Sequence, residues 1–264
     1  MRGRHASGTA WPAPSAIALQ RGRTGARARV QSKLPSRPDL TGPGGAISGR
    51  QPNPMSSHDA RIDAVAGTAN TWIVGDDEEV IVVDPGEDAR AVLAAVGDRE
   101  VMAVICTHGH AAHTSAAVAV ADRDEAPVAL HPADRPLWRE LHDDDPDIAM
   151  EDGGRFEVAG VALEVLHAPG HSRGSVVLFC EELGAAFTGD VVTETGPVPH
   201  DDGYPNWGRQ LDAIGGQVLT LPPQTRLLPG HGGELTVSVA EKQFDSWVAA
   251  GQDRSVGTGR QDGQ

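Results

Sequence analysis

Cysteine and aromatic residues are scarce in this sequence of 264 residues, and it contains no long hydrophobic run. Two cysteines, Cys106 and Cys180, are too few for a disulfide scaffold, so we expect both to be core thiols. No stretch approaches the roughly 20 consecutive apolar residues that a membrane-spanning helix needs, which argues against an integral membrane protein. Because aromatic residues make up only 4% of the chain, we expect a core of Val, Ala, Leu and Ile.

Basic residues are also few, and they are unevenly distributed along the chain. The whole sequence has a formal net charge of −15, which argues against nucleic acid as a partner. The first 57 residues nevertheless contain nine Lys or Arg and one acidic residue, so their net charge is +8 and that of the remaining chain is −23. We therefore expect a basic extension at residues 1–57 and one acidic domain at residues 58–252.

The basic extension is rich in Arg, Gly, Pro and Ser and has no lasting hydrophobic periodicity. Such a segment buries too little apolar surface to offset its conformational entropy, so we expect it to be disordered, like the tail at residues 253–264. The alternatives are a targeting or nucleic-acid-binding arm, or an upstream extension before a true start at Met55. Its longest apolar run, residues 16–19, is too short for a secretory signal, so we expect a cytoplasmic protein. The amino-acid composition of the chain is typical of a high-GC bacterial genome.

Short strands and helices alternate through the acidic part. Apolar or β-branched runs that end at turn residues predict strands at residues 71–74, 80–83, 101–106, 128–130, 155–158, 161–166, 175–180, 185–188 and 226–228. Helical spacing predicts helices at residues 88–96, 111–121, 206–219 and 237–250, and a short one through Leu137 and Trp138. Because hairpins are mixed with strand–helix units, we predict a layered α/β fold in which helices cover two sheets.

Histidines cluster just after these predicted strands, in turns that contain glycine. The residues concerned are His108, His110 and His113 after strand 101–106, His171 after strand 161–166, Asp190 after strand 185–188, and His231 after strand 226–228. Strand ends of a layered protein can meet at one rim, where functional sites are usually built. Imidazole and carboxylate groups together suit zinc, iron or manganese, so this pattern predicts a metal site.

The motifs that carry these residues resemble those of metallo-β-lactamase-fold hydrolases, particularly the glyoxalase II-like members. The family pattern runs Thr-His-x-His-x-Asp-His, Pro-Gly-His-[Ser/Thr]-x-Gly-Ser, [Ser/Thr]-Gly-Asp and Gly-His. Its counterparts here are residues 107–113, 169–175, 188–190 and 230–231, in the same order and at matching spacing. The resemblance covers roughly residues 62–250 and implies an αββα sandwich with a metal site along one edge.

The resemblance also implies roles for individual residues. His108, His110 and His171 would hold a first metal, His113 and His231 a second, and Asp190 would bridge the two. One or two zinc ions, with the first site favoured, or iron or manganese in their place, would activate a water for attack on a small ester or thioester. Asp190 and His113 are then the catalytic candidates. Asp84 matches an acid found in many members and could orient a ligand, although an Asp-Pro-Gly turn also explains it.

One residue departs from the family pattern. Ala112 stands where the family has an Asp that normally binds the second metal. Because a methyl group cannot bind a cation, we expect the second metal to be weakly held or absent and the activity to be impaired. Either the Asp has been replaced deliberately, or the chain is a naturally diverged member that uses one metal or does not catalyse. We favour the first explanation because all the other ligands are intact.

Two further functions and three substrate-side residues remain candidates. A mono-iron, persulfide dioxygenase-like oxidoreductase of the same fold would use His108, His171 and Asp190, and a non-catalytic binding protein could keep the same pocket. We expect a small-molecule substrate and no nucleic-acid or membrane partner. The sequence does not indicate whether the protein is a monomer or an oligomer. Tyr204 and Trp207 lie in a Gly- and Pro-rich stretch, where they could line a pocket or belong to a packed connector. Arg173 could meet an anionic substrate or could simply be an exposed Arg.

Overall fold

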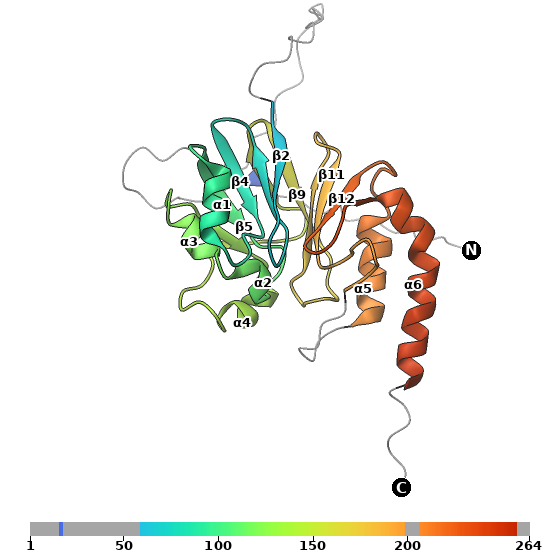
Figure 1. Ribbon diagram of the computed structural model, residues 1–264. Helices are drawn as coiled ribbons and strands as arrows, with labels where there is room; N and C mark the ends of the chain where they lie inside the picture. The colour runs from blue at the N-terminus through green and yellow to red at the C-terminus, as the bar shows by residue number, and fades with distance from the viewer. Residues whose placement is uncertain (1–15, 18–58, 199–205, 258–264) are drawn as a thin grey trace, which may run out of the picture.

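The computed structural model describes residues 16–17, 59–198 and 206–257. Two β-sheets pack face to face in this part of the chain, and helices cover the outer face of each (Figure 1). This arrangement confirms the α/β αββα sandwich predicted from the sequence. Among the helices of the described residues, none is both long and apolar enough to cross a membrane.

The first sheet has six strands in the order β2-β3-β4-β5-β6-β7. β2 (Arg61–Val65), β3 (Thr71–Gly75) and β4 (Glu79–Val83) pair antiparallel, and β5 (Glu100–Ile105), β6 (Val128–Leu130) and β7 (Ile148–Ala149) continue parallel to β4. The connections contain α1 (Ala89–Val96), α2 (Ala111–Thr114), α3 (Ala117–Ala121), the 3-10 helix η1 (Pro132–Asp134) and α4 (Arg135–Trp138). Because β4, β5 and β6 are parallel, their carboxyl ends meet at one edge of the sheet.

The second sheet has seven strands in the order β1-β8-β9-β10-β11-β12-β13. They are β1 (Ala16–Ile17), β8 (Arg155–Val158), β9 (Val161–His167), β10 (Val176–Cys180), β11 (Ala185–Gly189), β12 (Arg226–Pro229) and β13 (Leu235–Thr236). α5 (Trp207–Ala213), the π-helical turn η2 (Ile214–Val218) and α6 (Val237–Gly257) complete this half (Figure 1). β11 and β12 are parallel, so their carboxyl ends also lie together.

The core consists of three apolar layers, and β4 shows how alternation builds them. Ile81 and Val83 face the second sheet and pack with Phe156 and Phe187 in the layer between the sheets. Val80 and Val82, on the opposite face, pack against the residues of α1 and α3. A third layer lies between the second sheet and α5 and α6. The two cysteines are buried and free, as expected for core thiols.

Several boundaries differ from the sequence-based expectations for physical reasons. The helix expected at residues 111–121 is divided into α2 and α3, because the backbone N–H of Ala116 donates to Gly86 O, 2.8 Å away in another segment. The helix expected at residues 206–219 is present as α5 in its first part and continues as a π-helical turn around its glycine pair, where the helix was expected to be weak. β2, β7 and β13 were not expected from the sequence, and α6 extends past the predicted end at residue 250 to Gly257. Within residues 1–57, the structure describes only β1, which pairs with β8.

Candidate metal centre

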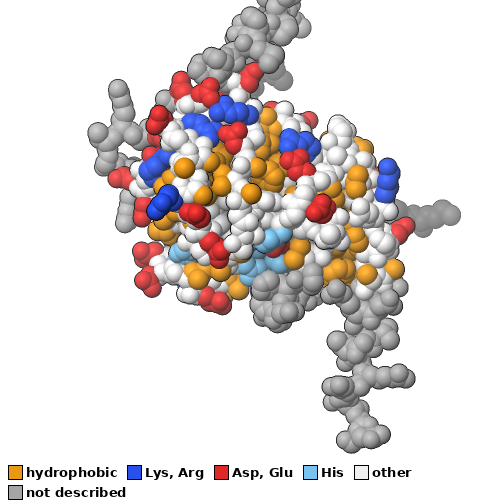
Figure 2. All heavy atoms as spheres, viewed as in Figure 1, with side chains coloured by type: hydrophobic (Ala, Val, Ile, Leu, Met, Phe, Trp, Pro, Cys, Tyr) orange, Lys and Arg blue, Asp and Glu red, His pale blue; other side chains and the backbone are white. Residues whose placement is uncertain are grey.

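The histidines and the aspartate of the sequence motifs meet at the rim formed by the carboxyl ends of the strands. His108 and His110 follow β5 and His113 lies in α2, whereas His171 follows β9, Asp190 follows β11 and His231 follows β12. The site therefore draws on both sheets. In the space-filling view the exposed histidine atoms form one patch at the junction of the two halves of the molecule (Figure 2).

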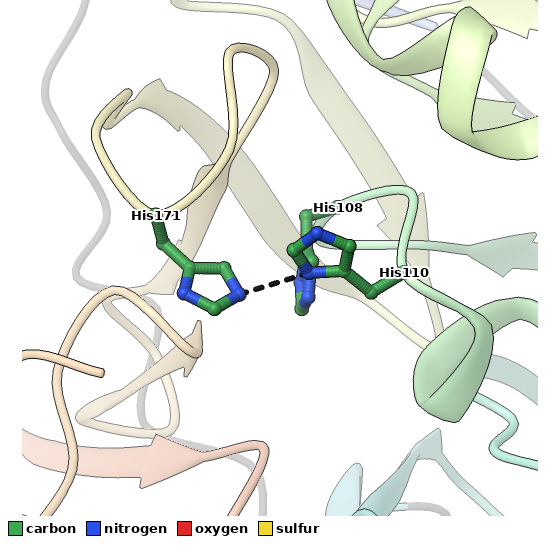
Figure 3. Close-up of side chains that lie close together, drawn as sticks. All are labelled: His108, His110 and His171. Carbon is green, nitrogen blue, oxygen red and sulfur yellow. Dashed lines mark hydrogen bonds between the residues drawn. The ribbon is translucent and has the colours of Figure 1, made fainter. Parts of the chain in front are cut away.

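His108, His110 and His171 form the first group of side chains. One ring nitrogen of each lies within 4.8 Å of the others, which is close enough for all three to bind one cation. Nδ1 of His110 is 3.0 Å from Nε2 of His171, and Figure 3 shows the three rings converging from two loops. Three imidazoles in this arrangement are a common protein ligand set for zinc.

Asp190 lies between this first group and a second group formed with His113 and His231. Its Oδ1 is 2.7 Å from Nδ1 of His231, and its Oδ2 is 3.4 Å from Nε2 of His113. The same Oδ2 is 3.6 Å from Nε2 of His171 and 4.0 Å from Nε2 of His108. One carboxylate is therefore within reach of both groups, as a bridging ligand must be.

Hydrogen bonds behind the rings determine which nitrogen faces the site. Nδ1 of His171 is 2.8 Å from the carbonyl oxygen of Val198, which can only accept, so Nδ1 carries the proton and Nε2 the lone pair. The Thr107 hydroxyl donates to Asp84 and therefore accepts from Nδ1 of His108, 3.2 Å away. Acceptors placed behind imidazoles in this way orient them as metal ligands.

Two buried ring nitrogens have no hydrogen-bond partner in the described structure, Nε2 of His108 and Nε2 of His113. An unsatisfied buried polar atom costs about 1–3 kcal/mol. Burial lowers the pKa of His108 well below its usual value, and the nearby His113 and His171 lower it further, so this ring is neutral and able to bind a cation. The orphaned nitrogens beside Asp190 therefore fit a metal ion.

The charge at Asp190 points in the same direction. Burial acts to raise the pKa of Asp190, but the contacts with His113 and His231 outweigh it and hold the pKa well below the usual range. Burial acts to lower the pKa of His113, but Asp84 and Asp190 outweigh it and raise the pKa to about 10. The environment of Asp190 therefore favours its ionised form, which is the form that binds a cation.

Ala112 lies on the wall of a surface hollow of about 320 Å³, which His110, Ala112, His113, Asp190, Val198 and His231 line. The hollow lies directly over the second group. Asp190 is the only carboxylate among these lining residues, because a methyl group occupies the position of Ala112. The second group therefore has two imidazoles and a shared carboxylate, one ligand fewer than the motif normally supplies.

The loop that carries His231 is held close to the second group from two sides. A Cβ atom on Gly230 would lie 2.3 Å from Cε1 of His113, so only glycine lets this loop approach so closely. Asn70 binds the loop from the other side, through its backbone N–H to Gly230 O and its amide to the carbonyls of Pro229 and Gly232. Asn70 belongs to no recognisable sequence motif, although it lies in a turn directly before β3 at the same rim.

The structure separates the remaining sequence candidates. Asp84 is buried behind His113, with Oδ2 3.0 Å from Nδ1 of that ring, as the ligand-orienting alternative requires. Arg173 is exposed and Trp207 packs against the layer beneath α5 and α6, and neither lines the hollow. Tyr204 lies outside the described residues. Asp134, which the sequence analysis missed, is buried between two of the ligand loops.

Comparison with known proteins agrees with this geometry. A family model with the description "Metallo-beta-lactamase superfamily" matches residues 64–240. The chain belongs to the metallo-beta-lactamase superfamily. An uncharacterized protein of Mycobacterium tuberculosis is 30% identical over 197 residues, which cover 64% of this chain and 87% of the relative.

Two further relatives have names that refer to hydrolysis. A probable metallo-hydrolase of Bacillus subtilis is 27% identical over 191 residues, which cover 66% of this chain and 90% of that protein. A hydroxyacylglutathione hydrolase of Pseudomonas paraeruginosa is 32% identical over 173 residues, 63% of this chain and 62% of the hydrolase. These names describe the relatives alone.

Solved structures support the same superfamily assignment. The B3 metallo-beta-lactamase BLEG-1 is similar with a TM-score of 0.61 at 25% identity, covering 71% of this chain and 97% of BLEG-1. TTHA1623, solved in a di-iron-bound form, has a TM-score of 0.60 at 25% identity, with 69% and 97% of the two chains covered. The superfamily fold is therefore shared over nearly the whole length of both solved proteins.

Proposed function

We propose that this protein is a metal-dependent hydrolase that cleaves a small ester or thioester with a metal-activated water. The observation that carries the proposal is the approach of His108, His113, His171 and His231 to the single carboxylate of Asp190, at 2.7 to 4.0 Å. Membership of the superfamily and the two relatives named as hydrolases support it. The glyoxalase II-like resemblance makes a thioester the first substrate class to test.

His108, His110 and His171 would hold the catalytic cation, and the Asp190 carboxylate lies beside them. Zinc bound there, or iron or manganese in its place, would supply a Lewis acid that polarises a carbonyl and lowers the pKa of a water towards neutrality. The Asp190 carboxylate would accept a hydrogen bond from that water and orient it. The carbonyl oxygen of Val198 accepts a hydrogen bond from Nδ1 of His171, and the Asp84 carboxylate accepts one from Nδ1 of His113. These bonds hold the two rings in orientation.

The hollow over these residues favours a small substrate. Its volume of about 320 Å³ lies at the lower end of the roughly 300–1,000 Å³ range of ligand pockets. Ala112 and Val198 give its wall an apolar part that suits an acyl chain, beside the polar groups of His110 and His231. The net charge of −23 outside the basic extension supports a small-molecule substrate rather than a nucleic acid.

Ala112 is the reason to expect impaired activity. His113, His231 and Asp190 alone offer the second group one carboxylate, which is shared with the first group. A second cation there would have one negative charge fewer to offset its own, so its affinity falls. The first group keeps its complete ligand set, and the protein as written therefore acts with a single tightly held metal.

A mono-iron oxidoreductase that acts on a persulfide is the second candidate. Nε2 of His108 and Nε2 of His171 lie 4.0 and 3.6 Å from Oδ2 of Asp190, and two imidazoles with one carboxylate form the usual ligand set of non-haem iron oxygenases. The similarity to a protein solved in a di-iron-bound form adds weight to iron as the metal.

One set of assays distinguishes these functions. The full chain and an Ala112→Asp variant are loaded separately with zinc, ferrous iron or manganese and given a panel of acyl thioesters and aryl esters. We expect hydrolysis that a chelator abolishes and that increases in the variant. Oxygen uptake on glutathione persulfide by the iron form alone, without ester or thioester hydrolysis, would instead support the oxidoreductase. Saturable ligand binding without turnover in any form would identify a non-catalytic binding protein.

A further inference from the structure

Asp134 connects the two loops that carry the first group of histidines. It ends η1, its exposed fraction is 1%, and both of its carboxylate oxygens accept hydrogen bonds. Oδ2 accepts from the backbone N–H of Gly109 at 2.9 Å and from the hydroxyl of Ser172 at 2.5 Å. Oδ1 accepts from the backbone N–H of Gly174 at 2.6 Å. All three donors belong to the ligand loops.

The positions of these donors in the sequence show what the carboxylate links. Gly109 lies between His108 and His110, in the loop that follows β5 of the first sheet. Ser172 directly follows His171, in the loop between β9 and β10 of the second sheet. One buried side chain therefore ties together the segments that bear all three histidines of the first group, although the segments come from different sheets.

Both loops pack directly on Asp134. A Cβ atom on Gly109 would lie 2.9 Å from the carbonyl oxygen of Asp134, and one on Gly174 would lie 2.8 Å from its Cγ. Both distances are too short for real contacts, so neither loop can carry a side chain here without moving. The position of each loop is therefore determined by the position of the Asp134 side chain and its backbone.

We propose that Asp134 is a positioning residue that sets the separation of His110 and His171, and thereby the metal affinity of the first group. The inference rests on the proposed function only in taking that group as a metal site. Its chemistry requires a carboxylate, because each oxygen faces a backbone N–H. Asparagine at this position would place an NH₂ group against one of those donors and lose at least one hydrogen bond.

The test compares Asp134→Asn with a matched control, Asp76→Asn. Asp76 is also buried and accepts from two backbone N–H groups, those of Glu78 and Glu79, but it lies in the turn before β4, at the opposite end of the sheet. Zinc affinity is measured for each full-length protein by competition with a chromophoric chelator. The visible spectrum of bound cobalt reports the ligand geometry, and urea denaturation with a chelator reports the stability of the metal-free form.

Asp134→Asn is expected to weaken zinc binding by about 10- to 100-fold and to change the cobalt spectrum, as loss of a group behind metal ligands usually does. Asp76→Asn, in which the amide oxygen can still accept both bonds, is expected to leave zinc affinity and the cobalt spectrum as in the wild type. Equal zinc affinity and identical cobalt spectra for Asp134→Asn and the wild type would overturn the proposal. A general loss of affinity in both variants would also overturn it, because the effect would then reflect stability alone.

Ser172→Ala keeps the proposal testable if Asp134→Asn does not fold. It removes one of the three hydrogen bonds to the carboxylate and is expected to lower zinc affinity about fivefold. An unchanged affinity in Ser172→Ala would then count against the proposal. If the Asp134 variant binds metal more weakly but the wild type hydrolyses no ester or thioester, the positioning role of Asp134 stands and the proposed hydrolase function is wrong. A wild type that binds no metal would overturn both proposals.

Discussion

Asp84 accepts a hydrogen bond from His113, with Oδ2 of the carboxylate 3.0 Å from Nδ1 of the ring. The same carboxylate accepts from the N–H and the hydroxyl of Thr107, each at 2.7 Å, and that hydroxyl lies behind His108. Asp84 has a φ of +50°, a conformation that costs a non-glycine residue about 1–3 kcal/mol. A strained, buried carboxylate thus orients one ring in each group of histidines.

Replacement of Asp84 by Asn tests this role. The variant offers one oxygen where the carboxylate offers two, so either His113 or Thr107 loses its acceptor. We expect zinc affinity to fall by about 10- to 100-fold, and the free energy of unfolding of the metal-free protein to fall by about 1–3 kcal/mol. A competitive zinc titration and urea denaturation measure the two effects. Asp147→Asn is the control: its amide oxygen can still accept from the Val128 N–H at the other end of β6, so zinc affinity should not change.

Single replacements of His110 and His231 distinguish the two groups. His110 belongs to the first group, so His110→Ala is expected to remove the tightly bound metal from the protein as written. His231 contacts Asp190 in the second group, so His231→Ala should leave that metal in place. Elemental analysis after dialysis measures both. His167→Ala, whose ring stacks on His131 outside both groups, is the control, and an equal loss of metal in all three variants would contradict the division.

Zinc should stabilise the folded protein in a way that depends on His171. A ligand at 100 times its Kd stabilises the native state by about 2.7 kcal/mol, which for a domain of this size raises Tm by roughly 5–10 °C. A bound metal would satisfy Nε2 of His108, a buried nitrogen that has no hydrogen-bond partner in the described structure. Differential scanning calorimetry with and without zinc measures the shift. A shift of the same size in His171→Ala would show that zinc binds elsewhere.

Local sequence signals were sufficient for the fold and for the residues of the rim. The strands at Val128–Leu130 and Arg155–Val158 have the predicted bounds, because continuous or alternating apolar runs between turn residues specify them locally. The division between α2 and α3 has no local signal. It depends on the hydrogen bond from Ala116 to Gly86, which lies across a strand connection and exists only in the folded chain.

The supporting residues were harder to find than the histidines, for the same reason. Asp134 and Asn70 have no motif of their own, and their partners lie 25 to 162 residues away in the sequence. Trp207 is a case that the sequence left open. An aromatic residue after a Gly- and Pro-rich stretch could be a pocket wall or part of a packed connector, and its indole N–H lies 3.3 Å from the carbonyl oxygen of Trp247 in α6. Tertiary packing, which the sequence pattern does not encode, determined its place.

The metal content of the purified protein and of its Ala112→Asp variant tests the central claim most directly. In the wild type, the first group has three imidazoles and access to Asp190, whereas the second lacks a carboxylate at Ala112. We predict about one tightly bound ion per chain in the protein as written and about two in the variant, measured by elemental analysis after dialysis. Two tightly bound ions in the protein as written, or no increase in the variant, would contradict this account.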